Sequence, residues 1–493
     1  MLRRSVLLGA VLSATACTTG PAYRTPEGAA LGVPPAFSVA PPTPRTDLTR
    51  WWQRFDDPLL VRLVESAATT NLDVGQALAR LAQAREQLVV SRSSLFPQLS
   101  ASGSYSRLEV LRGGGGTTTL PDGTIVQRNV GASDSFSVGG DARYQADLFG
   151  GIASGIAASR AQLDASRFDV ATVLLSVQSE IARNYLTARL AQAQLANARA
   201  SIALQDDNLE IAGFRVQAGL VSSLDAEQAR TARAQTAAQL PTIEASYAAA
   251  VARLGVLTGQ APGALRQQLA APAPIPTGDA RIGTGIPADT LRLRPDVRAA
   301  ERNLAAAVAQ IGVATAQLYP ALNLGGSIDT NATSFTALTD IVNGRLFASI
   351  AQTIFDGGRL RAQVRGQRAA ADAAFLAYKQ TVLTALEDVE NAIVALDTAT
   401  TREREFTVAA DAARNFALLS RLQYRSGLTD FTTLAQAESA LLSAQNGVVQ
   451  ARADRASALV QLMTALGGGW SEDSLPGPAA LPTPDRAPYT KDR

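Results

Sequence analysis

The sequence contains the same pattern twice, and this internal repeat constrains the fold more than any other feature. A stretch rich in alanine and glutamine runs into Phe96-Pro97 in the first half, and a similar stretch runs into Tyr319-Pro320 in the second. Further motifs recur in the same order: Asp73-Val74, Leu148-Phe149 and Ala218-Gly219-Leu220 match Asp296-Val297, Ile354-Phe355 and Ser426-Gly427-Leu428. The pattern predicts a tandem duplication of about 200 residues, in which each copy builds one supersecondary unit.

Each copy carries a helical stretch that is too long for a compact domain. Residues 151 to 217 contain no proline, and their apolar residues recur at steps of three and four, as do those of residues 358 to 425. At 1.5 Å per residue, a helix of about 65 residues would be about 100 Å long. This length predicts a coiled-coil assembly or a tube, and the many alanines permit close approach of the helices.

A turn follows each long helix and predicts a helical hairpin. Gly219 and Gly427 lie just past the helices, where the left-handed C-cap conformation favours glycine. Ser222 and Asp430 are suitable N-cap residues for the return helices. We therefore expect long helical hairpins at 151–259 and 358–466.

Four shorter stretches predict β-strands, at about 98–110 and 134–149 in the first copy and about 321–330 and 345–355 in the second. Each stretch alternates apolar with small or polar residues over about ten positions, which is typical of transmembrane strands. A soluble, half-solvated sheet would show the same alternation, but an export signal and the lack of a spanning helix in the sequence favour the membrane. The glycine-rich segment 112–133 is expected to be a long, flexible loop.

The N-terminal residues predict export and lipid anchoring. Arg3-Arg4 precedes a short apolar run, which is the pattern of a signal peptide at 1–16. The single cysteine, Cys17, lies where a lipoprotein signal is cleaved and its cysteine is acylated, although Ala14-Thr15-Ala16 also fits an ordinary cleavage site. Since one acyl chain anchors a protein only marginally, we expect a second membrane element.

Composition and the repeat together divide the chain. Residues 17–50 predict a lipidated, extended tether. The first repeat occupies 51–260 and the second 287–467. The linker 261–286 and the tail 468–493 are rich in proline and are expected to be loose.

The residue types that are missing exclude several classes of function. Histidine is absent, which removes the commonest general base and the commonest metal ligand. One cysteine allows no intrachain disulfide and no thiolate metal cluster. The net charge is +2 and includes Arg3 and Arg4 of the leader, so nothing favours nucleic acid. We expect no enzymatic activity, no cofactor and no metal.

Four strands per chain are too few to close a barrel, and open strand edges are not tolerated in lipid. Two chains would give eight strands around a lumen filled with side chains, whereas three chains would give twelve strands and room for an open lumen. Cyclic symmetry combined with the internal repeat therefore predicts a homotrimer in which each protomer is pseudo-symmetric.

An ordered set of motifs extends over residues 17 to 470: Trp51-Trp52, Phe55-Asp56-Asp57-Pro58, Asn71-Leu72-Asp73, Phe96-Pro97, Asp147-Leu148-Phe149-Gly150, Arg294-Pro295-Asp296-Val297, Tyr319-Pro320 and Phe355-Asp356-Gly357-Gly358-Arg359. This set resembles the TolC-like outer-membrane factor family, in particular its lipoprotein branch of the NodT/OprM type. The resemblance implies a mixed α and β membrane protein. A trimeric twelve-stranded outer-membrane β-barrel, with four strands per chain, would continue into a long periplasmic α-helical barrel.

The resemblance also implies a function. The chain would be the outer-membrane exit duct of a tripartite efflux pump, a passive channel for small toxic compounds. Its partners would be a periplasmic membrane-fusion adaptor, an inner-membrane efflux transporter of the RND type and outer-membrane lipid. It would be lipid-anchored in the cell outer membrane, with a periplasmic extension. The alternative is a long coiled-coil periplasmic adaptor or scaffold protein without a membrane barrel.

Two groups of site residues follow from the resemblance. The hairpin turns would contact the adaptor through Gly219, Leu220, Val221, Ser222, Gly427, Leu428, Thr429 and Asp430. The acidic residue that the family often carries before the second tip glycine is missing from residues 418–425. The candidates for a periplasmic gate are therefore Arg421, Tyr424 and Arg425 in combination with Asp206, Asp207 and Glu210. Alternatively, these charges form a solvated helix face.

Overall fold

The computed structural model describes residues 19–39, 44, 46–112, 115–129 and 132–475. The chain forms two compact units. The first comprises Met1–Arg24, Ala84–Leu163 and Asn303–Ala374, and the second comprises Thr25–Gln83, Asp164–Arg302 and Phe375–Arg493. Both units therefore combine segments from the two halves of the sequence. Cys17, the predicted lipidation site, lies outside the described residues.

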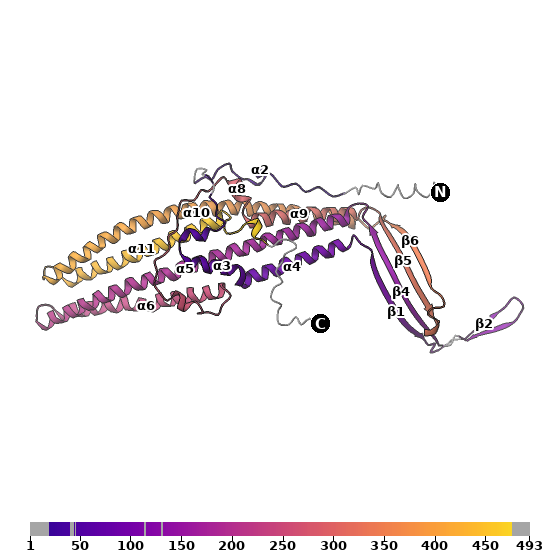
Figure 1. The fold of residues 1–493 in the computed structure, drawn as a ribbon, viewed down its shortest axis with the longest axis horizontal. Helices are drawn as coiled ribbons and strands as arrows, with labels where there is room; N and C mark the ends of the chain where they lie inside the picture. Colours follow the sequence, from indigo (N-terminus) through magenta and orange to yellow (C-terminus); the bar gives the residue numbers. More distant parts are fainter. Residues whose placement is uncertain (1–18, 40–43, 45, 113–114, 130–131, 476–493) are drawn as a thin grey trace. The chain divides into compact units, whose positions relative to one another are not determined.

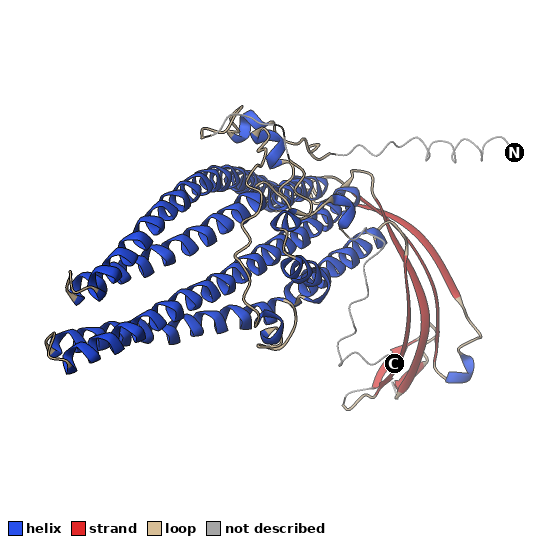
Figure 2. Ribbon diagram, turned by 60° about the vertical axis from the view of Figure 1, so that its left-hand side comes forward, coloured by secondary structure: helices blue, strands red, loops and turns tan. Residues whose placement is uncertain are grey.

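An antiparallel sheet of four strands forms a large part of the first unit (Figure 2). Its strands, in order across the sheet, are β1 (Gln98–Leu108), β4 (Ser133–Ala146), β5 (Ala321–Ala332) and β6 (Asn343–Ala351). One cross-strand row holds Leu99, Ala142, Gly326 and Leu346, and the next holds Ser100, Asp141, Ser327 and Arg345. Because successive residues of a strand point to opposite faces, the sheet has one apolar face and one polar face. The apolar face is open, since Leu346 is 91% exposed.

A second, smaller sheet corrects the prediction of a flexible loop between the first two strands of the large sheet. Strands β2 (Gly115–Thr119) and β3 (Ile125–Asn129) pair as an antiparallel hairpin. Gly123 takes a left-handed conformation with φ of +84°, and the Thr124 N–H donates to Asp122 Oδ1 at 3.0 Å. The turn chemistry of Asp-Gly therefore prevails over the glycine-rich composition around it.

The same turn joins a helix to a strand in both copies. After α4 (Leu72–Ser93), the N–H groups of Leu95 and Phe96 donate to carbonyls three residues earlier, and Pro97 precedes β1. After α9 (Pro295–Ala316), Leu318 and Tyr319 make the matching bonds before Pro320 and β5. Proline cannot continue the helical hydrogen bonds, so it ends the helix before the strand in both copies.

The first described residues of the chain are fixed against the first unit. The Thr19 hydroxyl donates to the Phe149 carbonyl at 3.0 Å, and the Phe149 ring stacks on Tyr319 with centroids 4.8 Å apart. Gly20 lies so close to α9 that a Cβ there would be 2.6 Å from the Cα of Gly312. The backbone of this segment therefore contacts the backbone of α9 directly, at Gly20 and Gly312.

Two helical hairpins dominate the second unit (Figure 1). Helix α5 (Gly151–Gln217) leads to α6 (Ser223–Leu257), and α10 (Arg359–Arg425) leads to α11 (Phe431–Ala465). The predicted N-caps are confirmed, because Ser222 Oγ accepts from the Leu224 N–H and Asp430 Oδ1 accepts from the Thr433 N–H. Among the described residues, no helix is both long and apolar enough to cross a membrane.

The largest hydrophobic core lies in the second unit, around the short helices η1 (Trp51–Phe55) and α3 (Pro58–Thr70). Trp51 and Leu60 are almost completely buried against residues of α5, α6 and α11. Asp57 caps α3 by accepting from the Leu59 and Leu60 N–H groups, and it also accepts from the Tyr185 hydroxyl of α5. Burial and the Asp57 carboxylate raise the pKa of that hydroxyl well above its ordinary value.

The tether, the linker and the start of the tail are not loose, which corrects a second expectation. Phe37, Leu269 and Trp470 are buried. The Thr46 N–H donates to the Gly283 carbonyl, so the tether and the linker are hydrogen-bonded to one another. Isolated apolar residues in these proline-rich segments bury in the core, and such single anchors produce no periodic pattern in the sequence.

Candidate functional site at the ends of the helical hairpins

The two hairpin turns share one backbone conformation. Gly219 has φ of +67° and Gly427 has φ of +74°. The Leu220 N–H donates to the Arg215 carbonyl and the Leu428 N–H to the Gln423 carbonyl, each at 2.9 Å. These are the bonds of a helix C-cap closed by a left-handed glycine. Leu220 and Leu428 are 70% and 78% exposed, so each turn presents one large apolar side chain to its surroundings.

The starts of the return helices differ. Leu224, in the first turn of α6, is 60% exposed, whereas Phe431, the first residue of α11, is 3% exposed. The Phe431 ring packs edge-on against Tyr424 with centroids 5.8 Å apart. The N–H of Thr433 holds the pKa of the Asp430 carboxyl below its ordinary value. The second turn is therefore the more tightly packed of the two.

Tyr424 joins the two hairpins. Its side chain is 1% exposed, and burial raises the pKa of its hydroxyl. The Arg215 guanidinium of α5 lies 4.8 Å from the centre of the Tyr424 ring and donates to the Tyr424 carbonyl at 3.0 Å. A cation over an aromatic face is attracted by the ring quadrupole, and here that attraction spans from α5 to α10.

A buried carboxylate makes a second connection between the hairpins. Glu438 of α11 is 6% exposed, and both of its oxygens accept from Asn208 Nδ2 of α5, at 2.7 and 2.8 Å. Arg421 of α10 donates to Glu438 Oε1 at 2.6 Å. One carboxylate thus links its own helix, α11, to the two helices α5 and α10. We call these three residues the Glu438 cluster.

The predicted gate residues whose bonds are seen have partners other than one another. Arg421 pairs with Glu438, and Asp206 pairs with Arg233 of α6, in place of the predicted pairs between the two groups. Successive helix residues are turned by about 100°, so Asp206 faces α6 while Asn208 faces the other hairpin. The remaining candidates, Arg425, Asp207 and Glu210, are exposed.

Sequence reasoning missed Glu438 and Asn208. A signal for Glu438 was present, because Leu434 and Leu442 lie four residues before and after it and both are buried. A carboxylate in line with a buried apolar stripe needs a partner. The partner itself lies 230 positions away, and no local pattern indicates Asn208.

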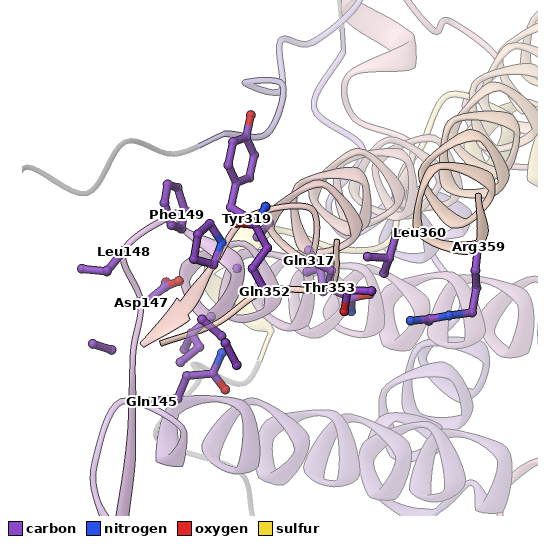
Figure 3. Close-up of a pocket in the computed structure, with 18 residues that line it drawn as sticks. Gln145, Asp147, Leu148, Phe149, Gln317, Tyr319, Gln352, Thr353, Arg359 and Leu360 are labelled. Atoms are coloured by element: carbon purple, nitrogen blue, oxygen red, sulfur yellow. The ribbon is translucent and has the colours of Figure 1, made fainter. Parts of the chain in front are cut away.

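The first unit holds a polar cavity where its strands meet its helices. The cavity is about 640 Å³, and Gln145, Asp147, Gln317, Gln352 and Arg359 are among the side chains that line it (Figure 3). The Asp147 carboxylate is already used there, because it accepts from the Ala153 N–H in the first turn of α5 at 2.7 Å. The amides and Arg359 supply hydrogen-bonding groups to this cavity, which we call the junction cavity, and residues such as Leu148 and Phe149 supply apolar surface.

Long paired helical hairpins and a four-stranded sheet with an open apolar face indicate a class of protein, the outer-membrane channels. The chain belongs to the outer membrane efflux protein family, whose model matches residues 63–260 and 286–468. It therefore serves as the outer-membrane exit duct of a tripartite efflux pump and is not an enzyme.

Known relatives are similar to this chain over nearly its whole length. The chain is 30% identical to nodulation protein T of Rhizobium leguminosarum bv. trifolii, covering 92% of this chain and 95% of that one. It is 31% identical to the pyoverdine export outer membrane protein OpmQ of Pseudomonas aeruginosa, covering 95% and 97%. The solved outer-membrane channel OprN matches with a TM-score of 0.81 and 32% identity over 92% of this chain and 100% of that one.

Proposed function

We propose that three copies of this chain close one twelve-stranded barrel in the outer membrane. The observation that carries this proposal is the pair of open edges of the sheet. Strand β1 pairs only with β4, and β6 pairs only with β5, among the described strands. In lipid every backbone donor and acceptor needs a partner, so β1 of one protomer would pair with β6 of the next. Three sheets of four strands give a ring wide enough for a lumen.

The internal repeat supports a tube of nearly sixfold symmetry below this barrel. The family model matches the chain twice, and the same helix-to-strand turn recurs in each half. Each protomer would contribute two helical hairpins to the periplasmic helical barrel. Three protomers would therefore supply six hairpins of closely similar shape.

The hairpin turns would contact a periplasmic membrane-fusion adaptor, which couples the duct to an inner-membrane transporter of the RND type. Leu220 and Leu428 are exposed on the two turns, at equivalent places, and would fit similar pockets. The other contacts would be Gly219, Val221, Ser222, Gly427, Thr429 and Asp430. The unequal residues after the turns would let the adaptor distinguish the two hairpins.

We further propose that the gate lies just above these turns. Tyr424 and Arg421 hold the second hairpin to the first through Arg215 and the Glu438 cluster. Rings of Arg425, Asp207 and Glu210, repeated around the threefold axis, would line the constriction. Asp206 would act indirectly, through its pair with Arg233.

Cys17 would carry the lipid anchor in the outer membrane, two residues before the fixed Thr19. Relatives are named for pyoverdine export and for toluene efflux, and we infer small organic compounds as the cargo of this chain as well.

Native mass spectrometry and planar-bilayer recording of the full chain extracted from outer membranes test the proposal. A trimer that conducts ions is expected. An acyl mass on Cys17 is expected in the wild type and not in Cys17→Ser, which should still form trimers. A monomer, or a trimer without conductance, would contradict the proposal.

A further inference from the structure

One cross-strand row on the polar face of the sheet differs from its neighbours. The row consists of Gln98, Arg143, Gly325 and Phe347, one residue from each strand. The adjacent row carries Ser100, Asp141, Ser327 and Arg345. Directly opposed residues of an antiparallel sheet share a face, so the Phe347 ring lies on the polar side although it is apolar.

Gly325 makes the position of that ring possible. A Cβ at Gly325 would lie 2.3 Å from Cζ of Phe347 and 2.8 Å from both Cε atoms. The ring therefore lies directly over the glycine backbone and reaches toward Arg143, which is opposite Gly325 on the next strand. Phe347 remains 47% exposed, so the ring is open to a ligand.

A cavity of about 540 Å³ adjoins this row. The polar residues of its lining include Ser94, Gln98, Arg143, Gln145 and Asn323, and the aromatic surface comes from Phe347, Phe96 and Tyr144. Arg143 is exposed, is the one charged residue of the lining, and takes part in none of the ion pairs found among the described residues. Gln145 also lines the junction cavity, so the two cavities share one amide side chain (Figure 3).

We propose that this row is a subsite for small anionic solutes that carry an aromatic ring. The Arg143 guanidinium presents a planar fork of donors that matches a carboxylate, and the three amides supply further hydrogen bonds. The Phe347 ring offers a stacking surface at the side of the guanidinium. This inference rests on the proposed function, because it makes the polar face the wall of the duct and names the class of cargo that pauses there.

Benzoate and its neutral analogue benzamide are the probes. Their binding to the solubilised full chain is measured by saturation-transfer NMR, which does not require a working pore. Arg143→Gln should lower the affinity for benzoate about tenfold, because a charge-assisted hydrogen bond is lost, and should leave the affinity for benzamide nearly unchanged. Phe347→Leu and Gly325→Ala should weaken both probes, since one removes the ring and the other displaces it.

Arg345→Gln is the matched control, because it removes the same charge from the polar face one row away. Equal losses of benzoate affinity in Arg143→Gln and Arg345→Gln would overturn the proposal, since they would indicate only a general positive potential on the polar face. Conductance of the same preparations separates the two proposals. A conducting channel without Arg143-dependent binding refutes the subsite alone, whereas Arg143-dependent binding without conductance supports a binding site at Arg143 and counts against the proposed open twelve-stranded trimer.

Discussion

The Glu438 cluster gives the sharpest test of how the two hairpins are held together. The perturbation is Arg421→Met, which keeps most of the aliphatic volume of the side chain and removes the cation. Glu438, whose side chain is 7% exposed, would then retain only the amide of Asn208. Removal of one partner from a buried ion pair costs about 3–5 kcal/mol. Because the Arg421 side chain is itself 22% exposed, water can replace part of the lost interaction, and we expect about 2–3 kcal/mol.

This energy translates into the opening of the hairpins. At 1.4 kcal/mol per factor of ten, a loss of 2–3 kcal/mol raises the equilibrium constant for separation about 30- to 140-fold. Single-channel recording should show a larger or longer-lived open state. The backbone amides of the helices around Asn208 and Glu438 should become less protected against hydrogen exchange. The double variant Arg421→Met/Glu438→Met should be destabilised by less than the sum of the two single variants, because it leaves no buried charge unpaired.

Glu244→Gln is the control, since it breaks the ion pair between Arg199 of α5 and Glu244 of α6, whose side chains are 63% and 53% exposed. Such a pair contributes about 0–1 kcal/mol, so conductance and exchange should stay close to those of the wild type. The reasoning is refuted if Arg421→Met resembles this control in both measurements, or if the effects of the double variant are simply additive.

Three further predictions concern single positions. Tyr424→Ala removes a fully buried aromatic ring and should destabilise the second tip by about 3–5 kcal/mol, seen as higher single-channel conductance; an unchanged conductance would argue against the gate. Gly283→Ala should lower the thermal stability of the second unit, because its Cβ would lie 1.6 Å from the Pro44 carbonyl oxygen; Gly75→Ala, in the same unit and with open space for a Cβ, should not lower it. The Asp430 cap has a pKa below the ordinary 3.8, so its stabilisation is complete above that value and disappears as the pH falls through the lower, folded pKa. Protection of the first turn of α11 should follow that loss, Asp430→Asn should abolish the pH dependence, and the Ser222-capped turn should show no matching change.

Local chemistry was sufficient to predict much of the fold. Proline at 97 and 320 stops a helix wherever the helix lies in space, and Ser222 and Asp430 cap by bonds to residues two or three positions away. The strands were equally predictable from the alternation of apolar and polar residues, because each face of the sheet meets one environment. The β2–β3 hairpin was missed because glycine and threonine dominate its sequence and only the Asp122-Gly123 turn favours it.

The site was less predictable, since its contacts join distant parts of the chain. The sequence indicated the charged residues near the tips but could not indicate which helix each of them faces. Asp206 and Asn208 are two positions apart, and one bonds to α6 and the other to α11. The same limit explains why the position of the Phe347 ring was not predicted. The ring can lie where it does only because Gly325, on the neighbouring strand, has no side chain.

The contact between Thr19 and Phe149 has a consequence for the way the protein is made. A chain that is exported from its N-terminus delivers Thr19 and Gly20 first, yet their partners follow 130 and 292 positions later. The segment at Thr19 and Gly20 must therefore wait, unbound, until the first copy and the start of the second copy, as far as Gly312, have crossed the inner membrane. If Cys17 is acylated as proposed, that modification would take place during this interval. Docking of Thr19 then becomes a late step of assembly, and it would report that the end of the first sheet segment at Phe149 and helix α9 of the second copy are in place.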